Sequence, residues 1–209
     1  GTNRRLVEYT FKQFTCNDME DWADATATDM RIGRDIDRFP GGEAGKFLTT
    51  CKACHSVMDG FRGAFARYDF DRNYVKHASI HASNQQSQSP MGVDRKMNQN
   101  GNTFSSGYLT TDDTWVNNAR SPANVQRFGW RGVTSSGAGV GSFGRAIANT
   151  KAFSKCITKK VYREVCRRPV ANFESAMVDQ LSANFESDGY NLKKLFEKVA
   201  IRPECLGGL

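Results

Sequence analysis

The chain is poor in histidine and has no long apolar run. Three histidines occur among its 209 residues, so few imidazoles are available to bind a metal or to move a proton. The absence of about 18 consecutive apolar residues excludes a transmembrane segment. The length fits one domain with a sizeable core. The sequence starts at glycine without a basic-then-apolar leader, so we expect a signal peptide to have been removed or to lie outside it.

One of the histidines belongs to a motif. Residues 51–55 read Cys-Lys-Ala-Cys-His, which is the C-x-x-C-H attachment signature of a c-type haem. Two thiols three residues apart on one helical turn can add to the two vinyl groups of a haem, and the next residue then presents its imidazole to the iron. The motif predicts one covalent haem c held by Cys51, Cys54 and His55, and therefore a redox protein.

The competing interpretation is a zinc site. His77 and His81 lie four residues apart, so with Cys51 and Cys54 they form C-x-x-C followed by H-x-x-x-H. Zinc fingers usually place about 12–15 residues between the two halves. Here the gap is longer and rich in polar residues, which favours haem.

A haem iron needs a second axial ligand for electron transfer or an open face for catalysis. Met58 is too near His55 to reach the opposite face of the ring, so the candidates lie downstream. They are Met97, which we favour, then Met91, His77 and His81. Both methionines sit in loop-like sequence that can hold a thioether over the iron. An open iron is the alternative.

Aromatic residues flank the motif on both sides. A helix that begins near Glu43 brings Phe47 onto the same face as Cys51. Phe61, Phe65 and Tyr68 form one helical stripe after the motif. These four side chains are expected to cover the haem or to belong to the core, and the sequence does not separate the two.

Haem attachment of this type implies a periplasmic or extracellular setting, where thiols oxidise. The cysteines left over are an even number, which suits two disulfides: Cys16, Cys156, Cys166 and Cys205. Cys156 and Cys166 fall on one predicted helix, roughly 15 Å apart at about 1.5 Å per residue. Disulfide geometry needs Cα atoms within about 7 Å, so each should reach Cys16 or Cys205 instead. Four buried free thiols are the alternative.

Hydrophobic periodicity predicts a mainly α protein. We expect a helix over residues 2–15, an irregular acidic stretch over 17–42, a polar surface loop over 76–90 and long ordered loops from 97 to 130. Three amphipathic helices, over 153–165, 173–185 and 192–199, should close the chain as a bundle. This organisation divides into an N-terminal helix and arm (1–42) and a haem domain with the C-terminal helices (43–209), together forming one structural unit.

Two further patterns are weaker. Residues 139–144 match G-x-G-x-x-G, but the dinucleotide fingerprint needs a buried strand before it, and the preceding sequence is polar and rich in glycine. The formal net charge is +7. Basic residues gather on one predicted helix, as a face that would steer an acidic redox partner or simply as a solvated face: Lys159, Lys160, Arg163, Arg167 and Arg168. The inferred compartment argues against a nucleic-acid partner.

The run from Cys51 to Asp69 resembles the cytochrome-type C-terminal region of large secreted bacterial proteins. Those proteins carry C-x-x-C-H-x-x-(I/M)-D-P-x-G-F and then a (F/Y)-D pair, and this chain has C-x-x-C-H-x-x-M-D and a Tyr-Asp pair. The likeness extends to residues 3–5, 14–16 and 96–100 and to the terminal helices. Gly60 stands where that family usually has proline, which would relax the turn. The resemblance implies a monohaem c-type domain and supplies no substrate.

Three functions follow from these observations. We favour electron transfer by a six-coordinate haem with His55 and Met97 as axial ligands, exchanging electrons with redox partner proteins. A haem enzyme of the peroxidase or oxidase type would need an open distal face and a positioned acid-base group. A structural subunit of an extracellular cytochrome assembly, homo- or hetero-oligomeric, is the third possibility.

Overall fold

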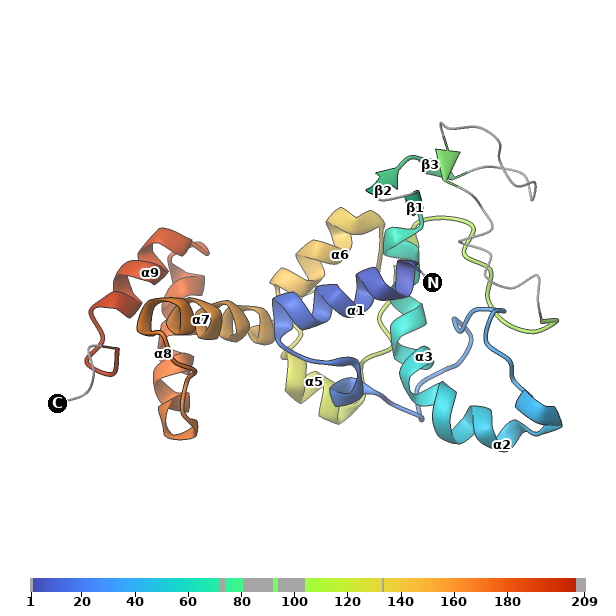
Figure 1. The fold of residues 1–209 in the computed structure, drawn as a ribbon, viewed down its shortest axis with the longest axis horizontal. Coiled ribbons are helices and arrows are strands. Elements are labelled where there is room, and N and C mark those ends of the chain that lie inside the picture. The colour runs from blue at the N-terminus through green and yellow to red at the C-terminus, as the bar shows by residue number, and fades with distance from the viewer. Residues whose placement is uncertain (1, 72–73, 81–91, 94–103, 133, 206–209) are drawn as a thin grey trace.

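The computed structural model describes residues 2–71, 74–80, 92–93, 104–132 and 134–205. These residues are mainly helical, as the periodicity predicts. Figure 1 shows two groups of elements along the long axis. One contains α1, α3, α5 and α6, and the other is the bundle of α7, α8 and α9. No described helix is long and apolar enough to cross a membrane.

The N-terminal third consists of a helix, an irregular arm and a second helical run. The helix α1 spans Thr2–Thr15. The arm contains the short 3-10 turns η1 (Met19–Trp22) and η2 (Pro40–Gly42) and an isolated bridge between Gly33 and Tyr108. The second run has four parts in series: α2 (Ala44–Lys46), the π-helical turn η3 (Phe47–Cys51), α3 (Lys52–Met58) and the 3-10 helix η4 (Asp59–Phe65). Both predicted helices and the irregular arm are confirmed.

Within the described residues the strands are short and form three separate pairs. β1 (Tyr68–Asp71) pairs antiparallel with β2 (Tyr74–His77), and β3 (Ser79–Ile80) pairs parallel with β4 (Gly92–Val93). β5 (Thr114–Val116) pairs antiparallel with β6 (Ser136–Ala138). Part of the polar loop predicted over 76–90 is therefore strand, and its remainder, residues 81–90, lies outside the described residues.

The segment predicted as ordered loops from 97 to 130 also contains regular structure. Besides β5 it includes α5 (Pro122–Phe128), whose first turn is capped because the Ser121 hydroxyl accepts a hydrogen bond from the Asn124 amide at 3.4 Å. The Asn124 side chain is buried and donates to the Trp22 carbonyl at 3.0 Å. This bond fastens α5 to η1. Residues 97–103 lie outside the described residues.

An aromatic cluster forms the first core. The ring of Phe11, on α1, lies 4.3 Å from Trp22 and 5.2 Å from both Phe61 and Phe128, measured between centroids. Phe143, on α6 (Gly139–Ala148), packs against Phe61 at 5.2 Å. All five side chains are essentially removed from solvent. The N-terminal helix therefore shares one core with the segment that follows the C-x-x-C-H motif.

Two glycines allow η4 to touch β5. A Cβ atom at Gly63 would overlap the carbonyl of Thr114, and one at Gly60 would overlap the carbonyl oxygen of Val116. Both glycines are buried inside η4. At Gly60 the structure adds a second role to the one that its place in the sequence motif suggests. Gly60 lets two backbones approach more closely than a proline or any other side chain would permit.

The C-terminal helices pack around a second core. They are α7 (Lys151–Cys166), α8 (Ser175–Ser187) and α9 (Leu192–Ala200), with a short 3-10 turn, η5 (Asn172–Glu174), before α8. Tyr162, Leu181, Phe185 and Leu195 lie fully inside this core. The three predicted amphipathic helices and their bundle are confirmed.

A buried carboxylate holds the connection between α7 and α8. Glu174 accepts hydrogen bonds from Arg168 at 2.6 Å, from Tyr162 at 2.9 Å and from the backbone amide of Ala171 at 2.7 Å. The bond from the Arg168 cation outweighs the burial of the acid, so the pKa of Glu174 falls to about 2. One residue of the predicted basic face is therefore folded inward against an acid.

Two disulfides tie distant segments together. Cys16 is bonded to Cys156 with Cα atoms 5.3 Å apart, and Cys166 is bonded to Cys205 with Cα atoms 4.7 Å apart. The prediction that Cys156 and Cys166 have separate partners is confirmed. The first bond joins the end of α1 to α7, and the second joins the end of α7 to the tail after α9.

We predict that loss of the first disulfide is the more destabilising. It spans 140 residues against 39 for the second, and chain entropy makes the longer loop worth on the order of 1 kcal/mol more. Urea unfolding of Cys16→Ala/Cys156→Ala and Cys166→Ala/Cys205→Ala variants measures the difference in the free energy of unfolding. Equal losses would contradict the loop-entropy argument.

We predict that Gly63→Ala lowers the free energy of unfolding by about 1–3 kcal/mol, because the added methyl group overlaps the backbone of β5. The matched control is Gly144→Ala. Gly144 is exposed on α6 with open space where a Cβ would lie, so alanine there should stabilise by about 0.5–1 kcal/mol. Chemical denaturation of both variants is the measurement, and a Gly63→Ala protein as stable as the parent would refute the close-contact argument.

Candidate functional site

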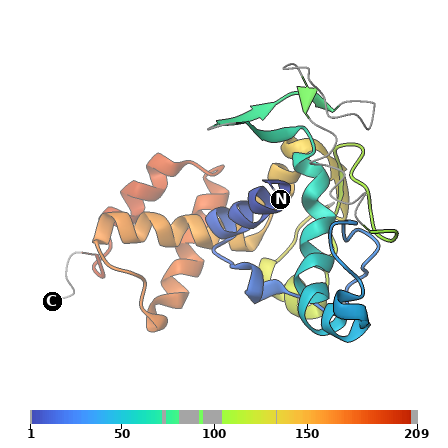
Figure 2. The ribbon, with the colours of Figure 1, turned by 45° about the vertical axis from the view of Figure 1, so that its right-hand side comes forward.

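The C-x-x-C-H residues lie on the helical run that stands away from the C-terminal bundle (Figure 2). Cys51 is the last residue of η3, and Cys54 and His55 follow within α3. All three side chains are partly exposed. Cys51 and Cys54 are the free cysteines, since the other four are paired in disulfides. The helix therefore presents two reduced thiols and an imidazole on adjacent turns.

This donor set fits a c-type haem. Positions three apart on a helix share a face, so both thiols can reach one planar ring system. Burial, followed by the nearby charges of Glu20 and Cys51, raises the pKa of the Cys54 thiol, which keeps it protonated and slow to oxidise at neutral pH. His55 can place its imidazole at the iron.

The imidazole of His55 contacts a carboxylate one turn further along. Its Nδ1 lies 3.3 Å from Oδ1 of Asp59, and its Nε2 makes no hydrogen bond with the described residues. An ionised carboxylate can only accept, so the hydrogen of a neutral His55 belongs on Nδ1. Nε2 then keeps its lone pair, which is the form that a metal requires.

Asp59 is itself the centre of a buried ionic cluster. Arg4 donates from Nε and Nη2 to its two oxygens, at 2.7 Å each. The backbone amide of Gly33 donates to Oδ2 at 2.9 Å, and Nη1 of Arg62 lies 3.5 Å from the same oxygen. The Asp59 side chain is fully buried. The cluster brings together α1, the irregular arm and η4.

The cluster is balanced in charge. Asp35 forms a second ion pair with Arg4 and lies 3.5 Å from Arg62, so two cations face two anions. Burial acts to raise the pKa of Asp59, but hydrogen bonds with Arg4 and His55 and the charges of both arginines hold it far below its usual range. Asp59 is therefore a permanent anion beside His55.

The irregular arm is fixed against the motif helix. The Asp24 amide donates to the Ala53 carbonyl at 2.7 Å, and the Ser56 hydroxyl donates to the Asp24 carbonyl at 2.8 Å. Gly33 has no room for a side chain, because a Cβ there would overlap Arg62 and Asp35. The acidic stretch predicted as an arm is thus part of the wall around the site.

The aromatic candidates divide into two groups. Phe47 is buried one turn before Cys51, and the guanidinium of Arg38 lies over its ring at 4.7 Å. Phe61 and Phe65 belong to the aromatic core described above. Tyr68 on β1 packs between Phe65, at 5.7 Å, and the ring of His77, at 4.8 Å. Cys54 packs against the core cluster that contains Phe61 and Phe65, and Phe47 is not a member of that cluster.

The candidates for the second axial ligand are largely outside the described residues. Met97, Met91 and His81 all fall there. His77 lies on β2 with an exposed side chain against Tyr68. Within the part of the chain that the structure describes, no group of three or more histidine, cysteine, aspartate or glutamate residues is arranged to hold a metal ion.

The residues that the sequence analysis missed are Asp59, Arg4, Arg62 and Gly33. A signal for Asp59 exists, because it lies four residues after His55 and therefore on the same helical face. Its partners carry no such signal, since Arg4 is 55 residues away and Gly33 is 26 residues away. The G-x-G-x-x-G run begins α6 and follows β6, which pairs antiparallel with β5 and so belongs to no βαβ unit.

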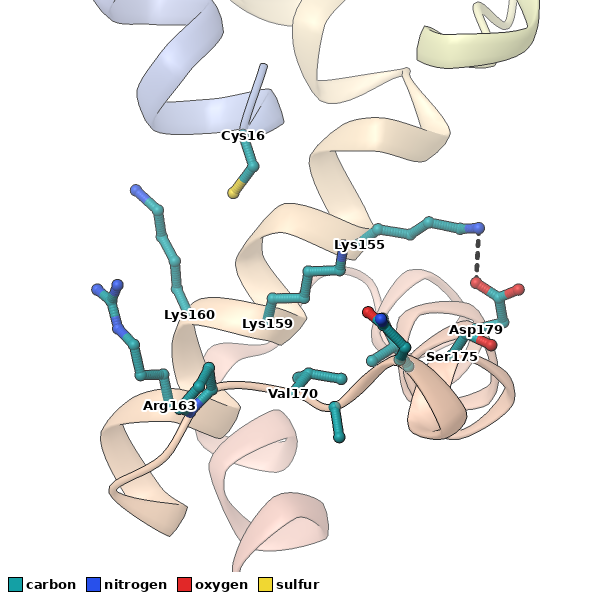
Figure 3. Close-up of a pocket in the computed structure, with 12 residues that line it drawn as sticks. Cys16, Lys155, Lys159, Lys160, Arg163, Val170, Ser175 and Asp179 are labelled. Carbon is teal, nitrogen blue, oxygen red and sulfur yellow. Dashed lines mark ion pairs between the residues drawn. The ribbon is translucent and has the colours of Figure 1, made fainter. Parts of the chain in front are cut away.

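A separate hollow of about 420 Å³ lies on the C-terminal bundle, between α7 and the start of α8 (Figure 3). Lys159, Lys160 and Arg163 line it, and Lys155 is paired there with Asp179 at 2.6 Å. Lys160 also donates to the side chain of Gln13 at 2.9 Å. The predicted basic face therefore exists in part, at a distance along the molecule from the C-x-x-C-H helix (Figure 1).

Comparison with protein-family models, with curated proteins and with solved structures found no match to this chain. Two free thiols, an imidazole and a buried anion are the groups that would hold an iron porphyrin if one is bound. In the part of the chain that the structure describes, neither thiol is hydrogen-bonded to the imidazole.

We predict that Arg4→Met lowers the free energy of unfolding by about 3–5 kcal/mol, because it leaves the buried Asp59 anion with a weaker set of partners. Arg67→Met is the matched control. Arg67 also donates to an aspartate, Asp113, at 2.8 Å, but about half of its side chain is exposed, so its loss should cost less than about 1 kcal/mol. Urea denaturation measures both. Similar losses of unfolding free energy in the two variants would contradict the argument that the buried ion cluster stabilises the fold more than an exposed ion pair does.

Proposed function

We propose that this chain is an electron-transfer protein that carries one haem c, attached through Cys51 and Cys54 and ligated by His55. The observation that carries the proposal is the combination at α3: the C-x-x-C-H motif presents two free, partly exposed thiols, and the adjacent imidazole has its Nδ1 directed to Asp59. A bound haem would supply a one-electron couple at its iron.

The surrounding residues support this role by what they do to the three ligating side chains. The carboxylate of Asp59 orients the ring of His55, and the irregular arm is bonded to the backbone of Ala53 on the same helix. Phe47 and Arg38 provide an apolar ring and a cation one turn before Cys51. Such a wall limits access of water to one side of the site and sets its charge, both of which tune a haem potential.

For the second axial position we propose Met97, with Met91 as the next candidate and a histidine after that. This part of the proposal rests on the sequence alone, because the methionines lie outside the described residues. His and Met ligation together would give a low-spin iron with no vacant position, which suits a carrier that exchanges electrons with partner proteins.

A haem enzyme of the peroxidase or oxidase type is the second candidate, and one observation favours it. A carboxylate hydrogen-bonded to the ligand imidazole increases the basicity of the ligand, and Asp59 is placed to do this. Greater electron donation to the iron assists reactions at an open distal face. In the electron-transfer protein a second axial ligand would occupy that face, whereas in the enzyme it would be open.

We further propose a periplasmic or extracellular location. Two disulfides in one chain are typical of an oxidising compartment, and c-type attachment belongs to the same setting. A role in an extracellular assembly of haem subunits would follow only if copies of the chain associate, which size-exclusion chromatography of the holoprotein measures directly.

The proposal predicts a covalent, low-spin haem in protein produced in a bacterial periplasm with haem-attachment machinery. Oxidised and reduced absorption spectra should show a six-coordinate c-type haem that stays on the chain in a denaturing gel. Cys51→Ala/Cys54→Ala should abolish attachment. Met97→Ala should remove the weak charge-transfer band of methionine-ligated ferric haem, while Met91→Ala, the matched control, should retain it.

The opposite results are equally informative. A high-spin ferric spectrum that shifts when cyanide or peroxide is added would replace electron transfer with the enzyme candidate. A chain that takes up no haem would refute both, and metal analysis of the purified protein would then test zinc at the same cysteines.

A further inference from the structure

The contact between His55 and Asp59 joins a partly exposed imidazole to a buried carboxylate. Asp59 lies one helical turn after His55, and its Oδ1 is 3.3 Å from Nδ1 of the imidazole. That distance is at the long end for a hydrogen bond, and the same oxygen also accepts from Nε of Arg4 at 2.7 Å. The Asp59 side chain is fully buried, whereas that of His55 is 20% exposed, so the carboxylate faces protein donors and not solvent.

From this geometry we infer that Asp59 is a positioning residue that selects the Nδ1–H form of His55 and so determines how strongly the imidazole donates to a bound iron. The part of the inference that concerns donation to iron rests on the proposed function. The selection of the Nδ1–H form concerns the chain alone and does not depend on haem. A ligating histidine needs a fixed ring orientation and a free Nε2 lone pair, and a partner on Nδ1 supplies both.

The carboxylate cannot turn away from His55. Arg4 holds both of its oxygens, the amide of Gly33 holds Oδ2, and Arg62 lies beside the same oxygen. Arg4 is held in turn by Asp35. The absence of a side chain at Gly33 is what admits Arg62 and Asp35. A segment 26 residues before Asp59 and a helix 55 residues before it therefore fix the orientation of the ligand imidazole.

The charges of the cluster also determine whether the reduction potential of an attached iron rises or falls. A carboxylate on Nδ1 increases the donor strength of the imidazole and favours the ferric state of an attached iron. Arg4 and Arg62 withdraw part of that negative charge. Replacing Asp59 with a neutral residue of the same shape should therefore raise the reduction potential. Loss of a negative charge elsewhere in the cluster should raise the reduction potential less.

The first experiment uses the chain without haem. The ring ¹⁵N chemical shifts of His55, measured by NMR in the apoprotein at an alkaline pH where an ordinary histidine is neutral, distinguish Nδ1–H from Nε2–H. We expect Nδ1–H in the parent protein. In Asp59→Asn that preference should weaken, because an amide can either donate to Nδ1 or accept from it.

Asp35→Asn is the matched control. This substitution removes one negative charge from the same cluster. Asp35 contacts Arg4, as Asp59 does, but it makes no contact with His55. The Nδ1–H form should persist in this variant. In holoprotein, Asp59→Asn should raise the reduction potential by more than Asp35→Asn does, and it should shift the Nδ1–H proton resonance of the ferrous form, which Asp35→Asn should leave in place.

The outcomes separate the two claims. An Nε2–H ring in the parent apoprotein overturns the role of Asp59, and this measurement needs no variant to fold. Equal shifts of the potential in both variants also overturn it, because the effect would then be that of charge alone. Failure of the parent chain to attach haem overturns the proposed function instead, while the apoprotein spectra still decide whether Asp59 selects the ring form.

Discussion

The ion cluster of Asp59 with Arg4 and Arg62 is the interaction on which the N-terminal half of the molecule depends. It joins α1, the irregular arm and η4 at one buried point, and it touches His55 on the motif helix. Apolar packing alone would not orient these segments so strictly, because aromatic contacts are tolerant of rotation whereas a carboxylate held by two guanidinium groups is not. The aromatic core around Phe11 then fills the space that this arrangement leaves.

The two cores are joined by α1 and α7. Phe11 lies in the first core and Tyr162 in the second, and the disulfide from Cys16 to Cys156 connects the two helices at the junction. The site residues lie on the side of the molecule that contains the first core, whereas the basic hollow lies on the bundle that contains the second core. The bundle therefore contributes a separate surface and anchors α1, whose other end carries Arg4.

Local sequence predicted the features that depend on nearby residues. The helices over 2–15 and 153–199 follow from apolar periodicity, and the separate partners of Cys156 and Cys166 follow from the rise of a helix. The paired strands were missed because strands of two to four residues carry almost no pattern. The ion cluster was missed for a different reason: Arg4, Gly33 and Asp59 meet only through the tertiary fold, and no spacing rule connects them.

The position of this cluster argues that it serves the site as well as the fold. Burying Arg4, Arg62 and Asp59 costs desolvation energy that their attraction, with that of the partly exposed Asp35, does little more than offset. Apolar residues of similar volume would stabilise a core at least as well. The cluster lies where a carboxylate oxygen reaches Nδ1 of the imidazole in the C-x-x-C-H motif. The cost in stability is best explained by the need to hold that imidazole in a single form.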